Sequence, residues 1–303
     1  MAEYRDPLVY YTLPGLMTSA GEQAGMLKGL PDDIPGLCRV VQQNLLHVHW
    51  AKRYGVTITP DDEQEVQLRR ASSMLARIAT QDDRMLTVPR PVEKRLVGNC
   101  RDFSVMLCTL LRHQGIPARP RCGFGTYFTP DWFEDHWICE VWNDDEARWM
   151  MVDAQLDALQ VEALGITFDT CDLPQGSFIP AGKGWQMCRA GEADPSRFGI
   201  FDIHGLWFVR GNLLRDFASL NRMELLPWDS WGLCDREPDA DDLALLDHVA
   251  ALTLAGNEAF EEVRALYEAE QDRLRVPDEI HSYNSDTPTI IDLRADELEM
   301  FPA

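Results

Sequence analysis

The pattern of apolar positions predicts a helix that begins directly after Asn99. Asn99 is a favourable N-cap, and Gly115 followed by Pro117 marks the end of the helix. Cys100 therefore lies in the first helical turn, where unpaired backbone N–H groups and the helix dipole favour a thiolate. The apolar face recurs at steps of three and four residues, which is the helical period: Phe103, Met106, Leu107, Leu110 and Leu111.

Two further segments alternate aromatic and β-branched residues as strands do. They are residues 136–142 and 148–153, and the polar run 143–146 between them has the composition of a turn. With Asp144 and Asp145 as the central loop residues, His136 faces Asp153 across an antiparallel hairpin. Directly opposed residues have Cβ atoms about 4.5–5.5 Å apart, so imidazole and carboxylate can form a hydrogen bond. A slip of one residue would place them on opposite faces.

Cys100, His136 and Asp153 together have the residue types of a thiol acyl-transfer triad. Cys100 would be the nucleophile, His136 would hold and then donate the thiol proton, and Asp153 would orient the imidazole. The backbone N–H groups at the helix start could also face an oxyanion. The alternative is that Cys100 is a buried structural cysteine.

Three motifs in this order resemble those of the transglutaminase-like superfamily. The stretch 98–104 (GNCRDFS) resembles its Gly-x-Cys motif, and 135–142 (DHWICEVW) resembles its His-x-Trp-x-Glu strand, although here Trp137 directly follows the histidine. Residues 149–153 (WMMVD) resemble its Trp-x-x-x-Asp strand. The resemblance covers residues 95–160 and is to the compact microbial type. It implies a papain-like α+β fold, with the nucleophile helix packed on an antiparallel sheet and with helical additions at both ends.

The resemblance also implies an oxyanion donor upstream of the nucleophile. The candidates are Gln42, Gln43 and Trp50, on a helix predicted over residues 37–54. Gln43 ranks first, and neighbouring glutamines on a helix diverge by about 100°, so both cannot face one site. The alternative is a solvated glutamine pair. His47 and His49 would point about 200° apart on the same helix, so no metal site is predicted there.

The chain divides into four predicted parts. Residues 1–95 form a helical N-terminal part of the catalytic domain, and residues 96–160 form the catalytic core. Residues 161–234 are rich in Gly, Pro and aromatic residues and are expected to be an irregular segment that packs near the cleft. Residues 235–303 form an acidic segment whose first half, over 238–275, reads as two helices.

Composition and charge restrict the partners. The net charge is −22, and residues 235–303 hold 19 Asp and Glu against five Arg, a balance of −14. Such charge disfavours nucleic acid and anionic membranes as partners. The sequence shows no signal peptide and no membrane span, and its eight cysteines form no CxxC pair. We therefore expect reduced thiols, a cytoplasmic location, no cofactor and no metal, calcium included, because no calcium-loop pattern occurs.

The sequence predicts hydrolysis or acyl transfer at an amide bond of a peptide or protein through a Cys100 thioester. Transfer would also require an amine acceptor. Two alternatives remain open. One is an arylamine N-acetyltransferase-like enzyme, whose Arg-Gly-Gly-x-Cys motif is absent because residues 96–99 read LVGN. The other is a non-catalytic binding protein with the same fold. Substrate identity and oligomeric state do not follow from the sequence.

Overall fold

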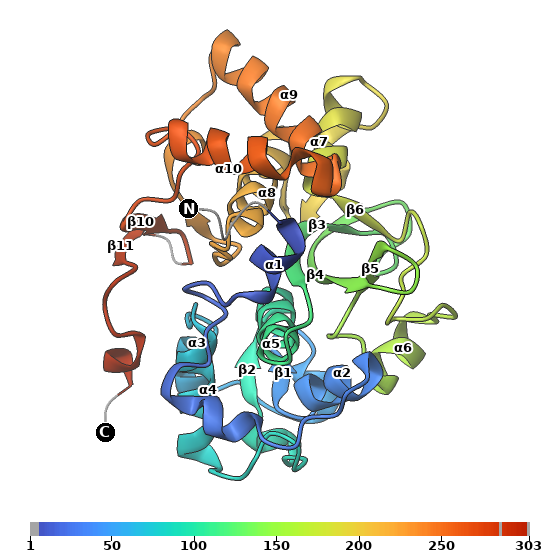
Figure 1. Cartoon of the computed structure of the whole chain (residues 1–303), viewed down its shortest axis with the longest axis vertical. Helices are drawn as coiled ribbons and strands as arrows, with labels where there is room; N and C mark the ends of the chain where they lie inside the picture. The colour runs from blue at the N-terminus through green and yellow to red at the C-terminus, as the bar shows by residue number, and fades with distance from the viewer. Residues whose placement is uncertain (1–5, 285–286, 302–303) are drawn as a thin grey trace. The chain divides into compact units, whose positions relative to one another are not determined.

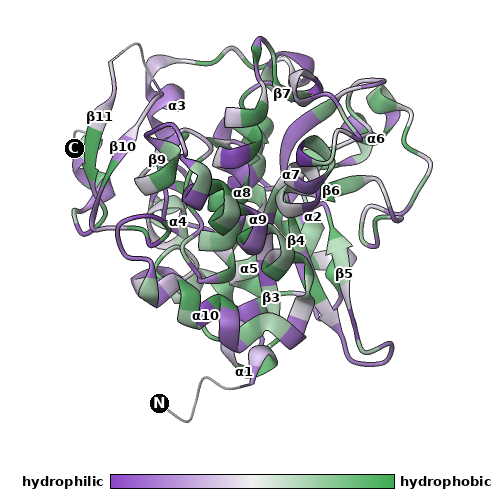
Figure 2. Ribbon diagram, turned by 90° about the horizontal axis from the view of Figure 1, so that it is seen from above, coloured by the Kyte–Doolittle hydropathy of each residue, from purple (hydrophilic) through white to green (hydrophobic). Residues whose placement is uncertain are grey.

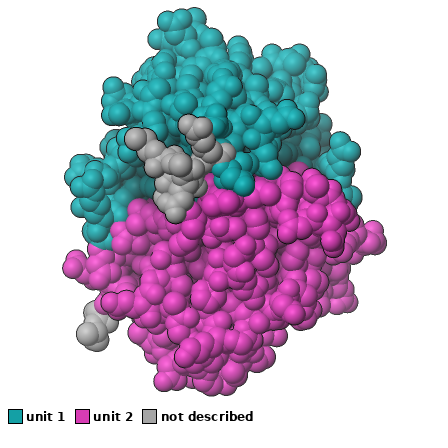
Figure 3. Space-filling model, viewed as in Figure 1, with its two compact units in different colours: residues 1–7, 121–137, 174–295 teal, residues 8–120, 138–173, 296–303 magenta. Residues whose placement is uncertain are grey.

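The computed structural model describes residues 6–284 and 287–301 of the chain. The fold is of the α+β class, as predicted (Figure 1). Contacts divide the chain into two compact units that are both discontinuous in sequence (Figure 3). Unit 1 comprises residues 1–7, 121–137 and 174–295, and unit 2 comprises residues 8–120, 138–173 and 296–303.

Unit 2 carries most of the predicted N-terminal and catalytic elements. Its helices are α1 (Pro7–Thr12), α2 (Ile34–Gln42), α3 (Pro60–Glu65), α4 (Ala71–Gln81), α5 (Cys100–His113) and α6 (Ala158–Leu164), with 3₁₀ turns η1 (Gly21–Leu27), η2 (Ala51–Tyr54), η3 (Val92–Lys94) and η7 (Glu297–Met300). Its strands are β1 (Leu45–His47), β2 (Leu96–Gly98) and β5 (Arg148–Val152). The predicted helix after Asn99 is confirmed as α5.

The core of unit 2 forms around α5. Its apolar face, including Leu107, Leu110 and Leu111, is fully buried against residues of α2 and α4. Residues from the hairpin of β4 (Phe133–Asn143) and β5 join the same core, among them Val141 and Val152. Helix α5 is therefore held by apolar packing, from which most helix stability in proteins originates.

Residues 174–295 make up most of unit 1. Its helices are α7 (Ala181–Arg189), α8 (Leu206–Leu220), α9 (Ala240–Leu254) and α10 (Phe260–Ala269), with 3₁₀ turns η4 (Pro195–Arg197), η5 (Gly232–Cys234) and η6 (Gly256–Ala259). Its strands are β6 (Phe178–Pro180), β7 (Phe198–Ile200), β8 (Ile203–His204), β9 (Asp229–Ser230), β10 (Glu279–Ser282) and β11 (Thr289–Asp292).

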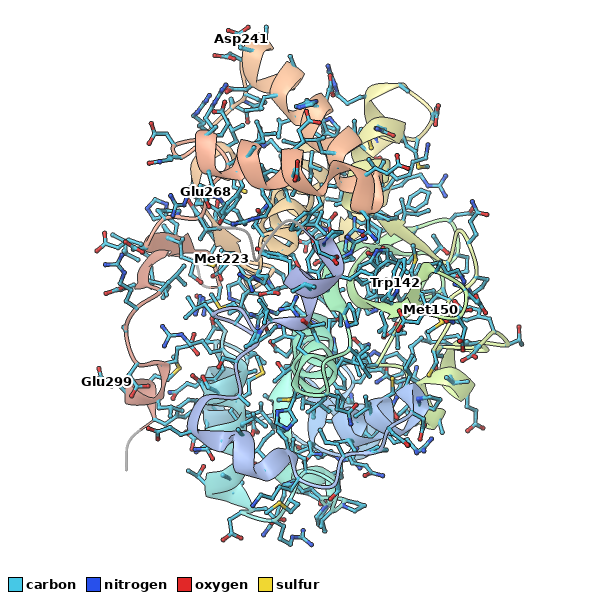
Figure 4. All side chains as sticks on the ribbon, viewed as in Figure 1. Trp142, Met150, Met223, Asp241, Glu268 and Glu299 are labelled. Atoms are coloured by element: carbon cyan, nitrogen blue, oxygen red, sulfur yellow. The ribbon has the colours of Figure 1, made fainter. Side chains whose placement is uncertain are left out.

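Helix α8 is the centre of unit 1 and is hydrophobic over much of its length (Figure 2). It packs against α7 and α9. Helices α7 and α9 approach closely at Gly182. A Cβ added there would lie 2.2 Å from Thr253 Oγ1, so this contact requires glycine. Helices α7 and α8 lie within residues 161–234, so the expectation of an irregular segment is wrong. The two helices predicted over 238–275 are confirmed as α9 and α10, whose outer faces carry acidic side chains such as Asp241 and Glu268 (Figure 4).

The largest sheet has the strand order β6-β3-β4-β7-β8, with β5 also paired to β4. Strands β3 (Ala118–Gly125) and β4 (Phe133–Asn143) are continuous and have residues in both units. Within unit 2, β4 pairs antiparallel with β5, and within unit 1 it pairs parallel with β7. A second sheet in unit 1 has the order β11-β10-β9, and β1 and β2 form a parallel pair in unit 2.

The last described residues of the chain belong to unit 2. Both carboxylate oxygens of Glu297 accept backbone hydrogen bonds, from Arg69 N and Arg70 N, each at 3.1 Å. Arg70 is the N-cap of α4 and its side chain makes no capping bond, while Ala71 N, the first N–H of the helix, donates to Met17 O at 2.8 Å. The segment after residue 295 therefore fixes the two residues before α4, and Phe301 adds a ring beneath the Arg77 guanidinium at 4.6 Å.

Candidate active site

Cys100 is the first residue of α5, as the sequence predicts. The Asn99 side chain accepts a hydrogen bond from Arg101 N at 2.9 Å, and Asp102 Oδ2 accepts one from Asn99 N at 2.8 Å. These reciprocal bonds form a capping box that fixes the helix start. The Cys100 side chain is 8% exposed. The thiol thus lies at a well-ordered helix N-terminus, which is the environment that favours a thiolate.

Asp102 is buried and is held by a charged neighbour. Arg101 Nη1 donates to Asp102 Oδ1 at 3.1 Å, and both side chains are almost fully inaccessible. Burial raises the pKa of Asp102 to about 6, and the Arg101 guanidinium opposes that shift. The hydrogen bonds from Asn99 N and Arg101 Nη1 both favour the carboxylate form of Asp102.

The segment before Cys100 is fixed from two sides. Strand β2 pairs with β1, with His47 opposite Gly98, and Val48 N donates to Gly98 O at 2.8 Å. On the other side, Val97 N donates to the buried Glu65 carboxylate at 2.8 Å. Burial raises the pKa of Glu65, although hydrogen bonds from Val97 and Arg77 oppose the rise. The backbone that leads into Cys100 is thus hydrogen-bonded on both sides of β2.

Asp153 also belongs to unit 2 and is 1% exposed. It directly follows β5, where its backbone N donates to Thr170 O at 2.9 Å. Its Oδ1 accepts a hydrogen bond from Gln155 N at 3.0 Å. These bonds fix both the backbone and the carboxylate of Asp153.

The predicted hairpin exists, but its register differs from the prediction by two residues. Asn143 pairs with Arg148, and the ladder ends with Cys139 opposite Val152, so His136 is not the direct cross-strand partner of Asp153. The reason is the loop, which contains four residues rather than two. Asn143 Oδ1 accepts hydrogen bonds from Asp145 N at 3.0 Å and from Glu146 N at 3.2 Å, and Ala147 has a left-handed φ of 49°. A shift of two preserves the face on which each β4 side chain lies.

His136 lies in β4, in the part of that strand that belongs to unit 1. It is 2% exposed, and two aromatic rings meet it edge to face, Phe128 at 4.8 Å and Tyr127 at 5.9 Å between ring centroids. These rings restrict the orientation of the imidazole. Cys100 and Asp153 are thus in one unit and His136 is in the other, and the triad remains a prediction for all three residues.

The helix predicted over residues 37–54 is wrong, and with it the setting of the three oxyanion candidates. Helix α2 ends at Gln42, whose Nε2 donates to Leu156 O at 3.2 Å. Gln43 is the C-cap, and Trp50 lies in a turn before η2, where the Arg53 guanidinium stacks on its ring at 5.3 Å. Their role as oxyanion donors remains a prediction.

The helix ends where Asn44 begins a different set of hydrogen bonds. Asn44 Nδ2 donates to Val40 O at 2.6 Å and to Leu86 O at 2.9 Å, and Arg90 Nη1 donates to Asn44 Oδ1. The next three residues then pair with β2 instead of continuing the helix. His47 and His49 therefore do not point apart on a helix as predicted, and the centroids of their rings lie 5.6 Å apart. Over residues 6–284 and 287–301, no group of three His, Cys, Asp or Glu side chains could hold a metal ion.

Two residues that support the nucleophile were not predicted. Asp102 is the reciprocal member of the capping box, and the spacing Asn99-x-x-Asp102 was a visible signal for it. Glu65 could not be found in this way, because its partners Val97, Arg77 and Gln81 come from distant positions in the chain. Glu140 of the strand motif has a structural contact as well, since Arg119 Nε donates to it at 2.6 Å.

The family comparison matches the centre of this arrangement. Residues 57–154 match the model of the transglutaminase-like superfamily, which confirms the predicted resemblance and its papain-like fold class for that third of the chain. No curated protein matches the chain. All eight cysteines are free thiols, and no helix among the described residues has the length and apolar character needed to cross a membrane.

Two solved structures show a low similarity. One is a candidate cysteine protease from Cytophaga hutchinsonii, with 16% identity, 57% of this chain and 45% of that chain covered, and a TM-score of 0.34. The other is red sea bream transglutaminase, with 17% identity, 49% of this chain and 30% of that chain covered, and a TM-score of 0.32. This chain spans less than half the length of either protein, and the resemblance to the superfamily rests on the match over residues 57–154 alone.

Proposed function

We propose that this transglutaminase-like core catalyses acyl transfer or hydrolysis at an amide bond of a peptide or protein. The single observation that carries the proposal is Cys100 at the capped N-terminus of α5, inside the segment that matches the superfamily. The superfamily match supports a thiol-dependent acyltransferase or peptidase. The amide substrate, the order of the steps and the roles of the individual residues are proposed in addition.

In the proposed reaction, Cys100 Sγ attacks the amide carbonyl and forms a thioester. His136 holds the thiol proton and then donates it to the leaving amine, and Asp153 orients the imidazole. Backbone N–H groups at the start of α5 would stabilise the oxyanion. Water then hydrolyses the thioester, or an amine acceptor takes the acyl group. The buried setting of Asp153 and the rings around His136 support these roles, because both restrict side-chain orientation.

The test is the alkylation of Cys100 by iodoacetamide between pH 4 and pH 9, followed residue by residue by mass spectrometry. We expect Cys100 to react well below pH 8, and we expect this reactivity to disappear in His136→Ala. The exposed His204, replaced as His204→Ala, is the matched control and should leave the reaction unchanged. The fully buried Cys108 and Cys122 provide internal references for inaccessible thiols.

A reaction at Cys100 that rises only above about pH 8, as for an ordinary thiol, would contradict the enzyme proposal and favour a non-catalytic binding protein. If the reactive thiol is found, ammonia release from a glutamine-containing protein reports formation of the thioester. Incorporation of an added amine then identifies transfer, and ammonia release without incorporation identifies hydrolysis. Peptide-bond cleavage is followed in parallel with fluorogenic amides.

A further inference from the structure

Unit 1 contains a cavity of about 540 Å³ that the proposed chemistry does not use. Its walls come from the start of β4, the β7–β8 turn, one face of α8, strand β9 and the residues that follow η5 and β10. All of these residues belong to unit 1. The volume is within the range of about 300–1,000 Å³ that is usual for small-ligand sites.

Aromatic side chains form much of the wall, and several are exposed to an unusual degree. Trp207 is 55% exposed and Tyr283 is 50% exposed, while Phe208 meets Trp207 edge to face at 5.7 Å between ring centroids. Trp228 lines the same cavity and is half-buried. A large apolar side chain left in solvent is costly, and a group of them around a cavity marks a surface that another molecule covers.

The cavity is lined by a partly exposed carboxylate, that of Asp235, whose side chain is 23% exposed. It accepts a hydrogen bond from Ser230 Oγ, lies 2.8 Å from His281 Nδ1 and is also a hydrogen-bond partner of Tyr283. A carboxylate has about four acceptor positions, so Asp235 keeps one for a ligand donor. Deeper in the wall, Asp135 accepts from Asn212 Nδ2 at 2.6 Å, and burial raises the pKa of Asp135, so we assign the ligand-facing charge to Asp235.

Arg215 is the guanidinium among the described residues of the wall, and it is 8% exposed. It donates to Asn212 Oδ1 at 3.1 Å and to Asp229 O at 3.1 and 3.2 Å, so three of its five N–H donors are used within the protein. The more exposed Asp235 side chain is therefore the charged group that the cavity offers more openly. Aromatic faces beside a carboxylate suit a cation, because both attract positive charge and the rings also pack against an apolar stem.

We propose that this cavity binds a cationic side chain on an apolar stem, as lysine and arginine carry, presented by a polypeptide. The proposal extends the proposed function by naming a feature of its polypeptide substrate, and the binding itself does not require catalysis. Trp207 and Trp228 would contact the stem and the charge from the side, and Asp235 would accept hydrogen bonds from the ammonium or guanidinium group.

The test uses the full chain as the Cys100→Ala variant, so that binding is measured without turnover. Calorimetry and tryptophan fluorescence are recorded with the acetylated, methylamidated derivatives of lysine, of arginine and of the uncharged norleucine. We expect at least one cationic probe to bind about tenfold more tightly than norleucine. The lysine and arginine arms identify which cation the site prefers.

Two substitutions assign the binding to this cavity. Trp207→Ala should weaken the cationic probes about fivefold or more. Asp235→Asn should weaken them similarly while leaving norleucine unchanged. Phe201→Ala removes a neighbouring ring that is 67% exposed but does not line the cavity, and Asp241→Asn removes an exposed carboxylate from α9. Both controls should bind the probes as the parent does.

Equal binding of norleucine and the cationic probes, or no binding of either cation, would overturn the proposal. Binding that survives both Trp207→Ala and Asp235→Asn would overturn it as well. Because every measurement is made without the thiol, failure of the enzyme proposal would leave these results unaffected. Circular dichroism of each variant separates lost binding from lost folding.

Discussion

Replacing Gly98 by alanine should destabilise the start of α5 through one identified contact. A Cβ added at Gly98 would lie 2.8 Å from Asp102 Oδ2 and 3.1 Å from Asp102 Cβ. That same oxygen accepts the hydrogen bond from Asn99 N at 2.8 Å. Gly98 does not have a positive φ, so the requirement for glycine here is space and not backbone conformation.

The expected cost follows from the two ways in which the contact can be relieved. If Asp102 stays in place, the site is overpacked, which costs about 1–3 kcal/mol. If Asp102 moves, the buried Asn99 N–H loses its acceptor, which also costs about 1–3 kcal/mol. Since one relief replaces the other, the two costs do not add, and we expect a loss of about 2 kcal/mol in the free energy of unfolding.

Chemical denaturation followed by circular dichroism measures this loss, and alkylation of Cys100 at pH 6 gives a local readout. Gly25→Ala is the matched control, because a Cβ there meets nothing within 4 Å. That control should be neutral or stabilising by up to about 1 kcal/mol. A Gly98→Ala variant within about 0.5 kcal/mol of the parent, with unchanged alkylation of Cys100, would show that the contact with Asp102 does not govern this position.

Three further changes have expected outcomes. Asp216→Ala should cost about 3–5 kcal/mol in thermal or urea unfolding, because it leaves the buried Arg121 guanidinium without its bidentate partner at 2.8 Å, and a double-mutant cycle with Arg121→Met should recover much of that loss. Glu297→Ala should cost about 1–3 kcal/mol because it leaves Arg69 N and Arg70 N without this acceptor, whereas Glu299→Ala, which also lies in η7, should be nearly neutral. Arg236 lowers the pKa of Asp242 to about 2, below the ordinary 3.8, so this carboxylate stabilises the fold above pH 3.8 and the benefit disappears as the pH falls through about 2. The melting temperatures of Asp242→Asn and the parent should therefore differ at pH 6 and converge toward pH 2.

The sequence predicted the nucleophile helix well because its signals are local. Asn99, the apolar face and Gly115 act within one element, and each agrees with the others, so tertiary structure had nothing to override. The family motifs were recognised for the same reason, since each is a short run of consecutive residues.

The predictions failed where specific hydrogen bonds or close packing, and not the apolar pattern, decide the local structure. The helical pattern after residue 37 continues past Gln42, but Asn44 and the pairing of β1 with β2 end the helix through contacts with Leu86, Arg90 and β2. The hairpin register depended on side-chain bonds of Asn143 within its loop, which composition alone does not reveal. The helices α7 and α8 contain glycines and aromatic residues because they pack closely in unit 1, and this composition resembled a loop.

The position of Glu297 has a consequence for how the chain is made. A ribosome releases residues in order, at about 5–20 per second, so the first helices of unit 2 emerge long before residue 297. Until then Ala71 N has its acceptor Met17 O at 2.8 Å, whereas Arg69 N and Arg70 N lack the Glu297 carboxylate. Nascent chains that stop at residue 295 should therefore hold the two residues before α4 less firmly than chains that include Glu297.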